Sequence, residues 1–258
     1  MSRVFITGSV DGLGRMAAQL LIKQGHNVVL HARNQERARD AARSIPEAEA
    51  TVVGDLSSIA QTCEIAKQVN LLGKFDAVIH NAGVGYREPR RVETEGGLPH
   101  VFAINTLAPY ILTALVAKPR RLVYLSSGMH RSADSSLQDI TWTQRRWQGA
   151  EAYAESKFYD VLLAFAVARR WPDVLSNALE PGWVPTKMGG SGAPDDMDQA
   201  HRTQVWLAVS DDPAAVVSGG YFYHLRPRAV EPAARDPARQ DTLMTVCQRL
   251  SGIAFPDP

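Results

Sequence analysis

The sequence contains only two cysteines, Cys63 and Cys247, which lie far apart and form no CxxC pair. A disulfide framework and a cysteine-ligated zinc site are therefore excluded, and we expect two buried or partly buried thiols. An excess of charge of one sign is also missing, because 28 Lys and Arg residues are balanced by 27 Asp and Glu residues. A formal net charge of +1 provides no field that attracts nucleic acid or an anionic membrane, so neither is expected as a partner.

Long apolar runs are absent as well. The least charged stretch, residues 101–117, is interrupted by Asn105, Thr106, Pro109 and Thr113. It lacks the run of about 20 apolar residues that a membrane span requires. The N-terminus enters a strand-like run without the basic segment, apolar core and cleavage site of a signal peptide. We therefore expect a cytoplasmic protein.

With 45% hydrophobic and 21% charged residues, the 258-residue chain has the composition of a globular protein with a substantial core. Short β-rich runs alternate with longer helical stretches, which is typical of βαβ units and a parallel sheet. The expected strands are residues 3–7, 27–32, 50–53, 75–80, 121–126, 174–179 and 220–224. Helices are expected over residues 15–24, 151–170 and 197–209, and a surface loop over residues 226–239.

No linker or repeat interrupts this succession. We therefore predict one α/β domain over residues 1–258, a Rossmann fold with a doubly wound parallel sheet and helices on both faces.

The first expected strand runs into a glycine-rich turn, which is followed by a helix. Its residues are Thr7, Gly8, Ser9, Val10, Asp11, Gly12, Leu13 and Gly14. Gly8 permits a tight turn, Gly12 lets a pyrophosphate approach the backbone, and Gly14 allows close packing of helix and strand. Free N–H groups at the helix N-terminus favour an anionic ligand. The pattern predicts a dinucleotide site, the alternative being an ordinary loop that happens to hold three glycines.

The residues after the second expected strand indicate which dinucleotide is bound. NAD-specific proteins carry an acid there, whereas this sequence has Arg33. A guanidinium binds a 2′-phosphate with charge-assisted hydrogen bonds, and a carboxylate repels it. We therefore predict NADP(H) rather than NAD(H). The alternative is a solvated charge at the start of a helix.

The run from Tyr153 to Lys157 completes a set of motifs that resembles the short-chain dehydrogenase/reductase family. Six motifs occur in the family's order between residues 3 and 224. They are the TGxxxGxG turn above, the adenine-contacting pair Asp55 and Leu56, the NAG motif Asn81, Ala82 and Gly83, the helix residue Asn105, Ser127 after the fifth strand, and the PGxVxT segment with Pro181, Gly182, Val184 and Thr186.

This resemblance implies the strand order 3-2-1-4-5-6-7 and a nicotinamide cofactor contacted by these motifs. The 26-residue separation of Ser127 and Tyr153 resembles the retinol dehydrogenase-like branch. Retinoid activity is not carried over, because this chain shows no N-terminal membrane anchor.

Tyr153 and Lys157 are four residues apart and share one face of a helix. A tyrosine that exchanges protons near neutrality needs its pKa lowered by about 3 units, or roughly 4 kcal/mol. A cation at about 4 Å supplies about 4 kcal/mol at an effective dielectric constant near 20. We therefore expect Lys157 to lower the pKa of Tyr153, which acts as general acid and base. Without the other motifs, an exposed Tyr and Lys pair is the default interpretation.

Ser127 is expected to orient the substrate oxygen, while Ser126 points the other way and satisfies backbone groups. The resemblance implies that Asn105 holds a water linking Lys157 to solvent, the alternative being a buried capping residue. His130 is interpreted as a pocket or loop residue, since no GxSxG elbow supports a hydrolase triad. Asp195, Asp196 and Asp198 are interpreted as acids at a helix start, and no metal is expected.

Together these features predict an oxidoreductase that moves a hydride between NADP(H) and a carbonyl or secondary alcohol. The segments 128–149 and 183–203, with Met129, Trp142 and Trp147, are expected to close over an apolar substrate. The alternative is that Trp142 or Trp147 is simply a core residue. The alternative is an NADP(H)-binding sensor without turnover, which has no need of the residues Asn105, Ser127, Tyr153 and Lys157. The resemblance also implies a homodimer or homotetramer, with residues 110–116 and 221–223 as candidate surfaces.

Overall fold

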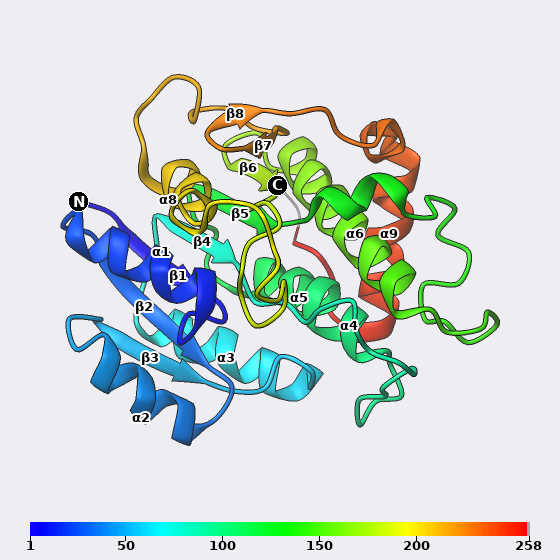
Figure 1. Cartoon of the computed structure of the whole chain (residues 1–258), viewed down its shortest axis with the longest axis horizontal. Coiled ribbons are helices and arrows are strands. Elements are labelled where there is room, and N and C mark those ends of the chain that lie inside the picture. The colour runs from blue at the N-terminus through cyan, green and yellow to red at the C-terminus, as the bar shows by residue number, and fades with distance from the viewer. Residues whose placement is uncertain (257–258) are drawn as a thin grey trace.

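The computed structural model describes residues 1–256, which form one sheet covered by helices (Figure 1). The strands are β1 (Arg3–Ile6), β2 (Asn27–Ala32), β3 (Ala50–Val53), β4 (Ala77–His80), β5 (Arg121–Leu125), β6 (Leu175–Leu179), β7 (Tyr221–Tyr223) and β8 (Arg226–Pro227). The helices are α1 (Gly12–Lys23), α2 (Gln35–Ser44), α3 (Ile59–Leu71), α4 (His100–Phe102), α5 (Ala108–Leu115), α6 (Gly149–Arg170), α7 (Met197–Ala200), α8 (Arg202–Val209) and α9 (Pro237–Ser251). Shorter turns are the π-helix η1 (Ala103–Leu107) and the 3₁₀-helices η2 (Gly128–Ser132) and η3 (Pro232–Arg235).

The strands follow the order β3-β2-β1-β4-β5-β6-β7-β8 across the sheet. Pairs from β3 to β7 are parallel, which confirms the predicted order, and β8 adds a short antiparallel edge. The order reverses between β1 and β4. In open α/β sheets ligands bind at the carboxyl ends of the strands beside such a reversal, so the glycine-rich turn after β1 lies where a ligand site is expected.

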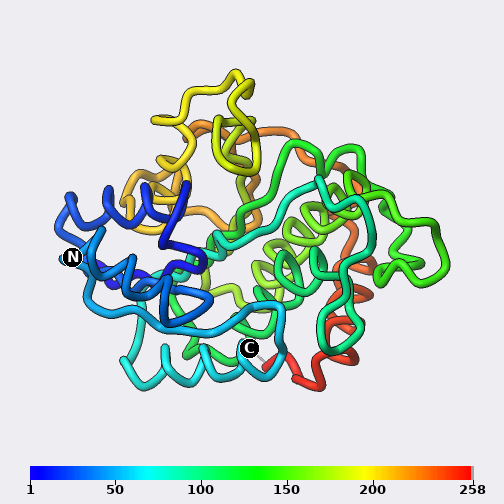
Figure 2. Tube along the Cα trace, turned by 60° about the horizontal axis from the view of Figure 1, so that its bottom comes forward, coloured from blue at the N-terminus to red at the C-terminus, as the bar shows by residue number. Residues whose placement is uncertain are grey.

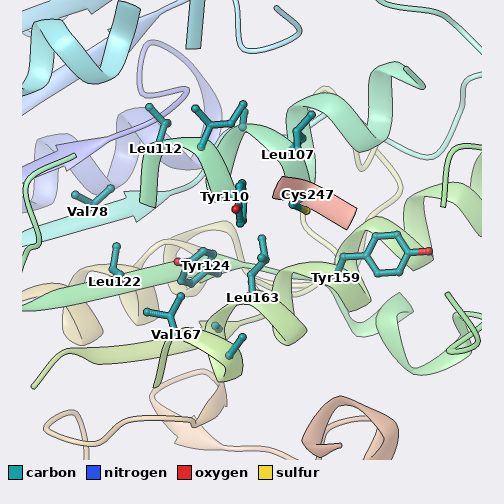
Figure 3. Packing of buried hydrophobic residues seen from close by; sticks show 14 of the residues in the cluster. Val78, Leu107, Tyr110, Leu112, Leu122, Tyr124, Tyr159, Leu163, Val167 and Cys247 are labelled. Carbon is teal, nitrogen blue, oxygen red and sulfur yellow. The ribbon is translucent and has the colours of Figure 1, made fainter. Parts of the chain in front are cut away.

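Alternate residues along each strand enter two separate hydrophobic cores. Phe5 belongs to the core under α3, α5, α6 and α9, whereas Val4 and Ile6 belong to the core under α1, α2 and α8. This alternation follows from the two-residue period of a strand. Figure 3 shows part of the first core, where Tyr110 and Cys247 pack near strand residues such as Tyr124. Helices on both faces thus hold the sheet rigid beneath the site.

Two sequence-based expectations are wrong at the level of elements. The expected surface loop 226–239 contains β8, η3 and the first turn of α9. Signals for α9 are present in the sequence, because Asp236 caps its start and Gly252, with φ of +72°, ends it. The expected helix 197–209 is interrupted at His201, which separates α7 from α8.

Most residues of the candidate association surfaces are interior, although Leu115 in the first segment is 36% exposed. Tyr110, Ile111 and Leu112 are buried in the first core, and the C-terminal segment covers them through a bond from the Tyr110 hydroxyl to the carbonyl of Ile253, 2.8 Å long. Tyr221 and Phe222 are buried as well, and β8 pairs with the outer edge of β7. Within residues 1–256, no helix is both long enough and apolar enough to cross a membrane. Cys247 is buried and Cys63 is partly buried, as expected.

Candidate active site

The glycine-rich turn has the conformation that a dinucleotide site requires. Gly8 and Gly12 have φ of +62° and +51°, in the left-handed region that favours glycine. A Cβ on Gly8 would lie 2.9 Å from the Cα of Ala82, whereas no heavy atom lies within 4 Å of a Cβ placed on Gly12. The backbone at the start of α1 is therefore accessible to a ligand, at the position where the N–H groups of the helix N-terminus lie. These residues fit a pyrophosphate.

Side chains from two neighbouring strands fix the shape of this turn. Thr7 accepts hydrogen bonds from the backbone N–H groups of Asn81 and Ala82, each 3.0 Å long. The Asn81 amide donates to the carbonyls of Thr7 and Gly8 at 3.0 and 3.1 Å. A Cβ on Gly14 would clash with that amide. The NAG motif therefore supports the turn from beneath, which explains the need for glycine at position 14.

Ser9 was predicted as a cofactor ligand, but its side chain is buried and points away from the open side of the turn. Its hydroxyl donates to the carbonyl of Ile6 and accepts from the N–H of His31, both at 2.9 Å. His31 in turn accepts from the Gly8 N–H at 3.0 Å and donates to the Gly54 carbonyl at 2.9 Å. Burial lowers the pKa of His31, so a neutral imidazole links β2 to the turn.

Arg33 follows β2 directly and is exposed beside the start of α2. A second guanidinium faces the same region from α2, since Arg37 lies 3.5 Å from Asp11 on the glycine turn. Asp11 also caps α1 and forms an ion pair with Lys187, whose hydrogen bond is the main reason that the pKa of Asp11 is lowered. Arg37 also pairs with Asp40 of α2 at 3.3 Å, so this side of the turn carries Arg33 and a paired Arg37.

The expected adenine-contacting pair divides into two roles. The Asp55 carboxylate accepts a hydrogen bond of 2.8 Å from the N–H of Ser57, which shapes the loop after β3. Leu56 is buried in the first core. Asp55 thus lies in the loop at the edge of the site, and Leu56 packs in the core.

The two serines after β5 point in opposite directions, as predicted. Ser126 is buried and donates to the carbonyl of Lys157 at 2.7 Å, which ties β5 to α6. Ser127 caps η2, and its hydroxyl lies near enough to the Tyr153 phenol to lower the pKa of that phenol. Its carbonyl accepts a hydrogen bond of 2.7 Å from His130, so His130 supports Ser127 from behind.

Tyr153 lies on α6 with its ring facing Tyr86, at a distance of 5.7 Å between ring centroids. The Lys157 ammonium lies 5.9 Å from the centre of the Tyr153 ring. Burial raises the pKa of Tyr153 by more than Lys157 and Ser127 lower it. The expectation that Lys157 brings this pKa below its ordinary value is therefore wrong for the protein described here. The physical reason is desolvation of the phenolate, together with a carboxylate, Asp160, beside the lysine.

Asn105 lies in the π-helix η1 and is buried. Its amide oxygen accepts from the Val84 N–H at 2.8 Å, and its amide nitrogen donates to the Val84 carbonyl and the Ser156 hydroxyl at 3.1 and 3.0 Å. A Cβ on Gly83 would lie 3.5 Å from both the Asn105 oxygen and the Lys157 nitrogen. The structure therefore brings Asn105, Gly83 and Lys157 together, and gives Asn105 a bracing role between β4 and α6.

The PGxVxT segment lies across the mouth of this site. Gly182 has φ of +91°, and the neighbouring Trp183 N–H donates to the Asp195 carboxylate at 2.6 Å. Val184 is buried, and Thr186 accepts from the Gly189 N–H at 3.1 Å. The segment continues as a loop that projects from the body of the molecule (Figure 2, yellow). Its ion pair from Lys187 to Asp11 and the close approach of Met188 to Gly85 place it over the glycine-rich turn and the loop after β4.

The tryptophans of segment 128–149 have structural partners. Trp142 is buried and donates to Glu155 of α6 at 3.0 Å, while Arg145 pairs with the same carboxylate and stacks on the Trp142 ring. Trp147 donates to the carbonyl of Glu88 at 2.9 Å. The start of this segment, where the Met129 N–H donates to the Ser127 hydroxyl at 3.3 Å, borders the site, and so does its end near Glu88 and Tyr86. For Trp142 the alternative of a core residue is therefore confirmed, because its ring belongs to the interior.

Comparison with known proteins identifies the family. The family model for short chain dehydrogenases matches residues 2–196. The chain belongs to the short-chain dehydrogenase family. The match includes the glycine-rich turn, the NAG motif, Ser127 and the run from Tyr153 to Lys157.

Two curated relatives of this short-chain dehydrogenase cover nearly its whole length. An uncharacterized oxidoreductase of Emericella nidulans is 45% identical over 99% of both chains. Mouse retinol dehydrogenase 13 is 30% identical over 98% of this chain and 84% of its own. The expected likeness to retinol dehydrogenases is confirmed.

Solved structures share the fold. An uncharacterized protein from Mycobacterium Paratuberculosis matches with a TM-score of 0.83 and 25% identity, over 99% of this chain and 95% of its own. A blue fluorescent protein from a metagenomic library, solved in complex with NADPH, matches with a TM-score of 0.69 and 19% identity, over 86% of this chain and 95% of its own. The fold of this short-chain dehydrogenase is thus one that holds a nicotinamide dinucleotide in that neighbour.

Four residues of the site were not anticipated from the sequence. For two of them the sequence offers only a spacing that places them near a predicted site residue. Arg37 follows Arg33 by four residues, and Asp160 follows Lys157 by three. Tyr86 and Lys187 reach the site from loops, so no periodic pattern marks them.

Proposed function

We propose that this short-chain dehydrogenase is an NADP(H)-dependent oxidoreductase that interconverts a carbonyl and a secondary alcohol. The observation that carries the proposal is the convergence of Ser127, Tyr153 and Lys157 beside the open glycine-rich turn. When bound, the nicotinamide dinucleotide supplies or accepts the hydride. The protein has to hold the substrate oxygen and move one proton.

Ser127 and Tyr153 are the groups that contact the substrate oxygen in this proposal. The Ser127 hydroxyl lies near enough to the Tyr153 phenol to lower the pKa of that phenol, so we expect both hydroxyls to donate to one oxygen placed between them. In reduction Tyr153 gives its proton to the oxygen, and in oxidation it takes the proton back. Burial keeps Tyr153 protonated in the protein described here, which suits the general acid of the reductive direction.

Selection of NADP(H) over NAD(H) rests on the charges beside the turn. Arg33 and Arg37 both lie where β2 ends and α2 begins, and guanidinium groups bind phosphate with paired hydrogen bonds. The turn residues Gly8, Gly12 and Leu13 supply backbone to the pyrophosphate, and residues 181–186 border the nicotinamide end in the family pattern.

The substrate that we propose is an apolar carbonyl compound or alcohol. Tyr86 packs edge-on against Tyr153, and Trp183, with 55% of its surface exposed, begins the loop above. Met188 from the same loop meets Gly85. Aromatic and thioether side chains at the mouth favour an apolar ligand.

The replacement Tyr153→Phe tests the proposed chemistry. It removes one oxygen and leaves packing intact, so NADPH should bind with unchanged affinity while kcat falls about 10²- to 10⁴-fold. The measurement combines a fluorescence titration with NADPH and turnover on a panel of aliphatic and aromatic ketones.

The alternative is an NADP(H)-binding sensor without turnover. Binding of NADPH by a wild-type protein that turns over no carbonyl or alcohol in the panel would favour the sensor. A Tyr153→Phe variant that keeps most of the wild-type kcat would contradict the assigned proton donor.

A further inference from the structure

We propose that Asp160 is a positioning residue for Lys157, whose ammonium it keeps charged and directed toward Tyr153; this inference rests on the proposed function. Asp160 lies three residues after Lys157 on α6 and is not part of the short-chain dehydrogenase motifs described above. Its carboxylate touches neither the glycine-rich turn nor the tyrosine. It acts, in this proposal, by holding the lysine, and its charge also contributes to the raised pKa of Tyr153.

The contacts of the ammonium carry the proposal. Lys157 donates to the carbonyl of Leu125 at 2.7 Å and to the carboxylate of Asp160 at 2.8 Å. An ammonium has three N–H groups, so these two bonds leave one for the side on which Tyr153 and Gly83 lie. Rotation about the terminal bond of the lysine is thereby fixed, and the remaining N–H has one direction.

Because Lys157 is buried, its ammonium needs the Asp160 carboxylate to stay charged. The side chains of Lys157 and Asp160 are only 5% and 3% exposed, and an ammonium at such a depth without a counter-charge loses its proton readily. Burial alone lowers the pKa of Lys157, but Asp160 and Tyr153 outweigh it and the pKa is raised. Asp160 contributes both a charge interaction and a hydrogen bond to this result.

The other groups around Asp160 do not replace it. Tyr124 of β5 faces it, and burial raises the pKa of that phenol, so Tyr124 stays neutral. Behind Tyr124, the Thr113 hydroxyl contacts both Tyr124 and His80. Burial lowers the pKa of His80 to about 3, which leaves it neutral too. Among the described residues that face Asp160, Lys157 is therefore its cationic partner.

Burial raises the pKa of Asp160 itself to about 7. The two charges are coupled, because the Lys157 ammonium favours the ionised form of Asp160 and the Asp160 carboxylate favours the charged form of Lys157. The ionised carboxylate keeps a lysine of this depth from becoming neutral as the pH rises. The contribution of Asp160 is therefore needed on the alkaline side.

Lysine side-chain NMR tests the inference without cofactor or substrate. The chain has six lysines, so a protein labelled with ¹³C at the lysine ε-carbon gives a small set of signals, of which that of Lys157 is the one lost in Lys157→Ala. In the wild type this signal should titrate at higher pH than those of the exposed lysines. In Asp160→Asn, which keeps the shape and an oxygen acceptor, its midpoint should fall by at least about one pH unit.

Matched variants separate charge from structure. Glu155→Gln removes another buried carboxylate of the same helix, one paired with Arg145 rather than Lys157, and should leave the Lys157 midpoint unchanged. Asp160→Glu keeps the charge and should restore most of the wild-type midpoint. A wild-type Lys157 that titrates at or below the exposed lysines would overturn the inference, whether or not Asp160→Asn folds. A midpoint that is unchanged in folded Asp160→Asn would overturn it as well.

Turnover gives an independent readout. Reduction requires Tyr153 and Lys157 to be protonated. In Asp160→Asn the alkaline limb of the kcat/KM profile should therefore move to lower pH. A purely structural defect would lower kcat/KM at every pH without moving this limb. Absence of any turnover in the wild type would reject the proposed function and leave the NMR result to decide the role of Asp160. A wild-type alkaline limb that Asp160→Asn does not move would reject the role of Asp160 and leave the proposed function intact.

Discussion

At the scale of single residues, Arg33 carries the choice of cofactor. Arg33→Ala should weaken NADPH binding by about 1.5 to 3 kcal/mol and leave NADH binding unchanged, because NADH lacks the 2′-phosphate. Calorimetric titration with both dinucleotides measures the difference. Arg39→Ala, which removes an exposed arginine further along α2, serves as the control. Equal weakening of NADPH and NADH by Arg33→Ala would contradict the assignment of NADP(H).

His130 supports Ser127 and should make stability depend on pH. Burial lowers the pKa of His130 to about 4, and the neutral ring donates to the Ser127 carbonyl and accepts from the Glu231 N–H. In the unfolded chain His130 takes up a proton near pH 6.5, whereas in the folded protein it does so only near pH 4. Stability from this group is therefore fully present above the unfolded pKa and is lost as the pH falls from about 6.5 to about 4.

The variant His130→Gln isolates this effect from all other titrating groups. Over the same interval the wild type should lose more unfolding free energy than the variant, by up to about 1.4 kcal/mol per pH unit. Urea denaturation at several pH values provides the comparison. Parallel pH profiles for the two proteins would show that His130 titrates normally in the folded state.

At the scale of elements, the loop before α6 is fastened to that helix by one buried carboxylate. Glu155 accepts hydrogen bonds from Arg145 at 2.7 and 2.8 Å and from Trp142 at 3.0 Å. Arg145→Ala leaves Glu155 without its cation, and loss of one partner of a buried pair costs about 3 kcal/mol. Because the contact lies away from the glycine-rich turn, NADPH affinity should be unchanged.

Chemical denaturation of Arg145→Ala and of Arg146→Ala, its exposed neighbour, tests this role. Only the first should shift the midpoint. If both variants were as stable as the wild type, the loop would be held by the packing of Trp142 on Trp147 and not by the ion pair.

At the scale of the whole molecule, we propose from the family resemblance that the protein is a homodimer or homotetramer. Most residues of the segments first considered for the interface are interior, since Tyr110 and Tyr221 are buried beneath other parts of the same chain. Of these segments, Leu115 is exposed and can take part in association. Light scattering across a range of concentrations should give a multiple of the 28.2 kDa chain mass. A single-chain mass at every concentration would refute the proposal.

The sequence by itself determined the sheet and the positions of the motifs on it. Strands buried on both faces are nearly continuous apolar runs, and the glycine-rich turn, the NAG motif and the run from Tyr153 to Lys157 each depend on local spacing. Such features are set by neighbours in the chain, so the fold class and the opposite directions of Ser126 and Ser127 could be predicted, while the strand order followed from the family resemblance.

Only the tertiary structure decided the surroundings of those motifs. The raised pKa of Tyr153, the pairing of Asp160 with Lys157 and the interior position of Trp142 all depend on burial between elements distant in sequence. Desolvation and ion pairing are properties of three-dimensional neighbours, and a sequence pattern gives the residues without their depth. The same physical reason explains why the apolar segment around Tyr110 was predicted as a surface and proved to be core.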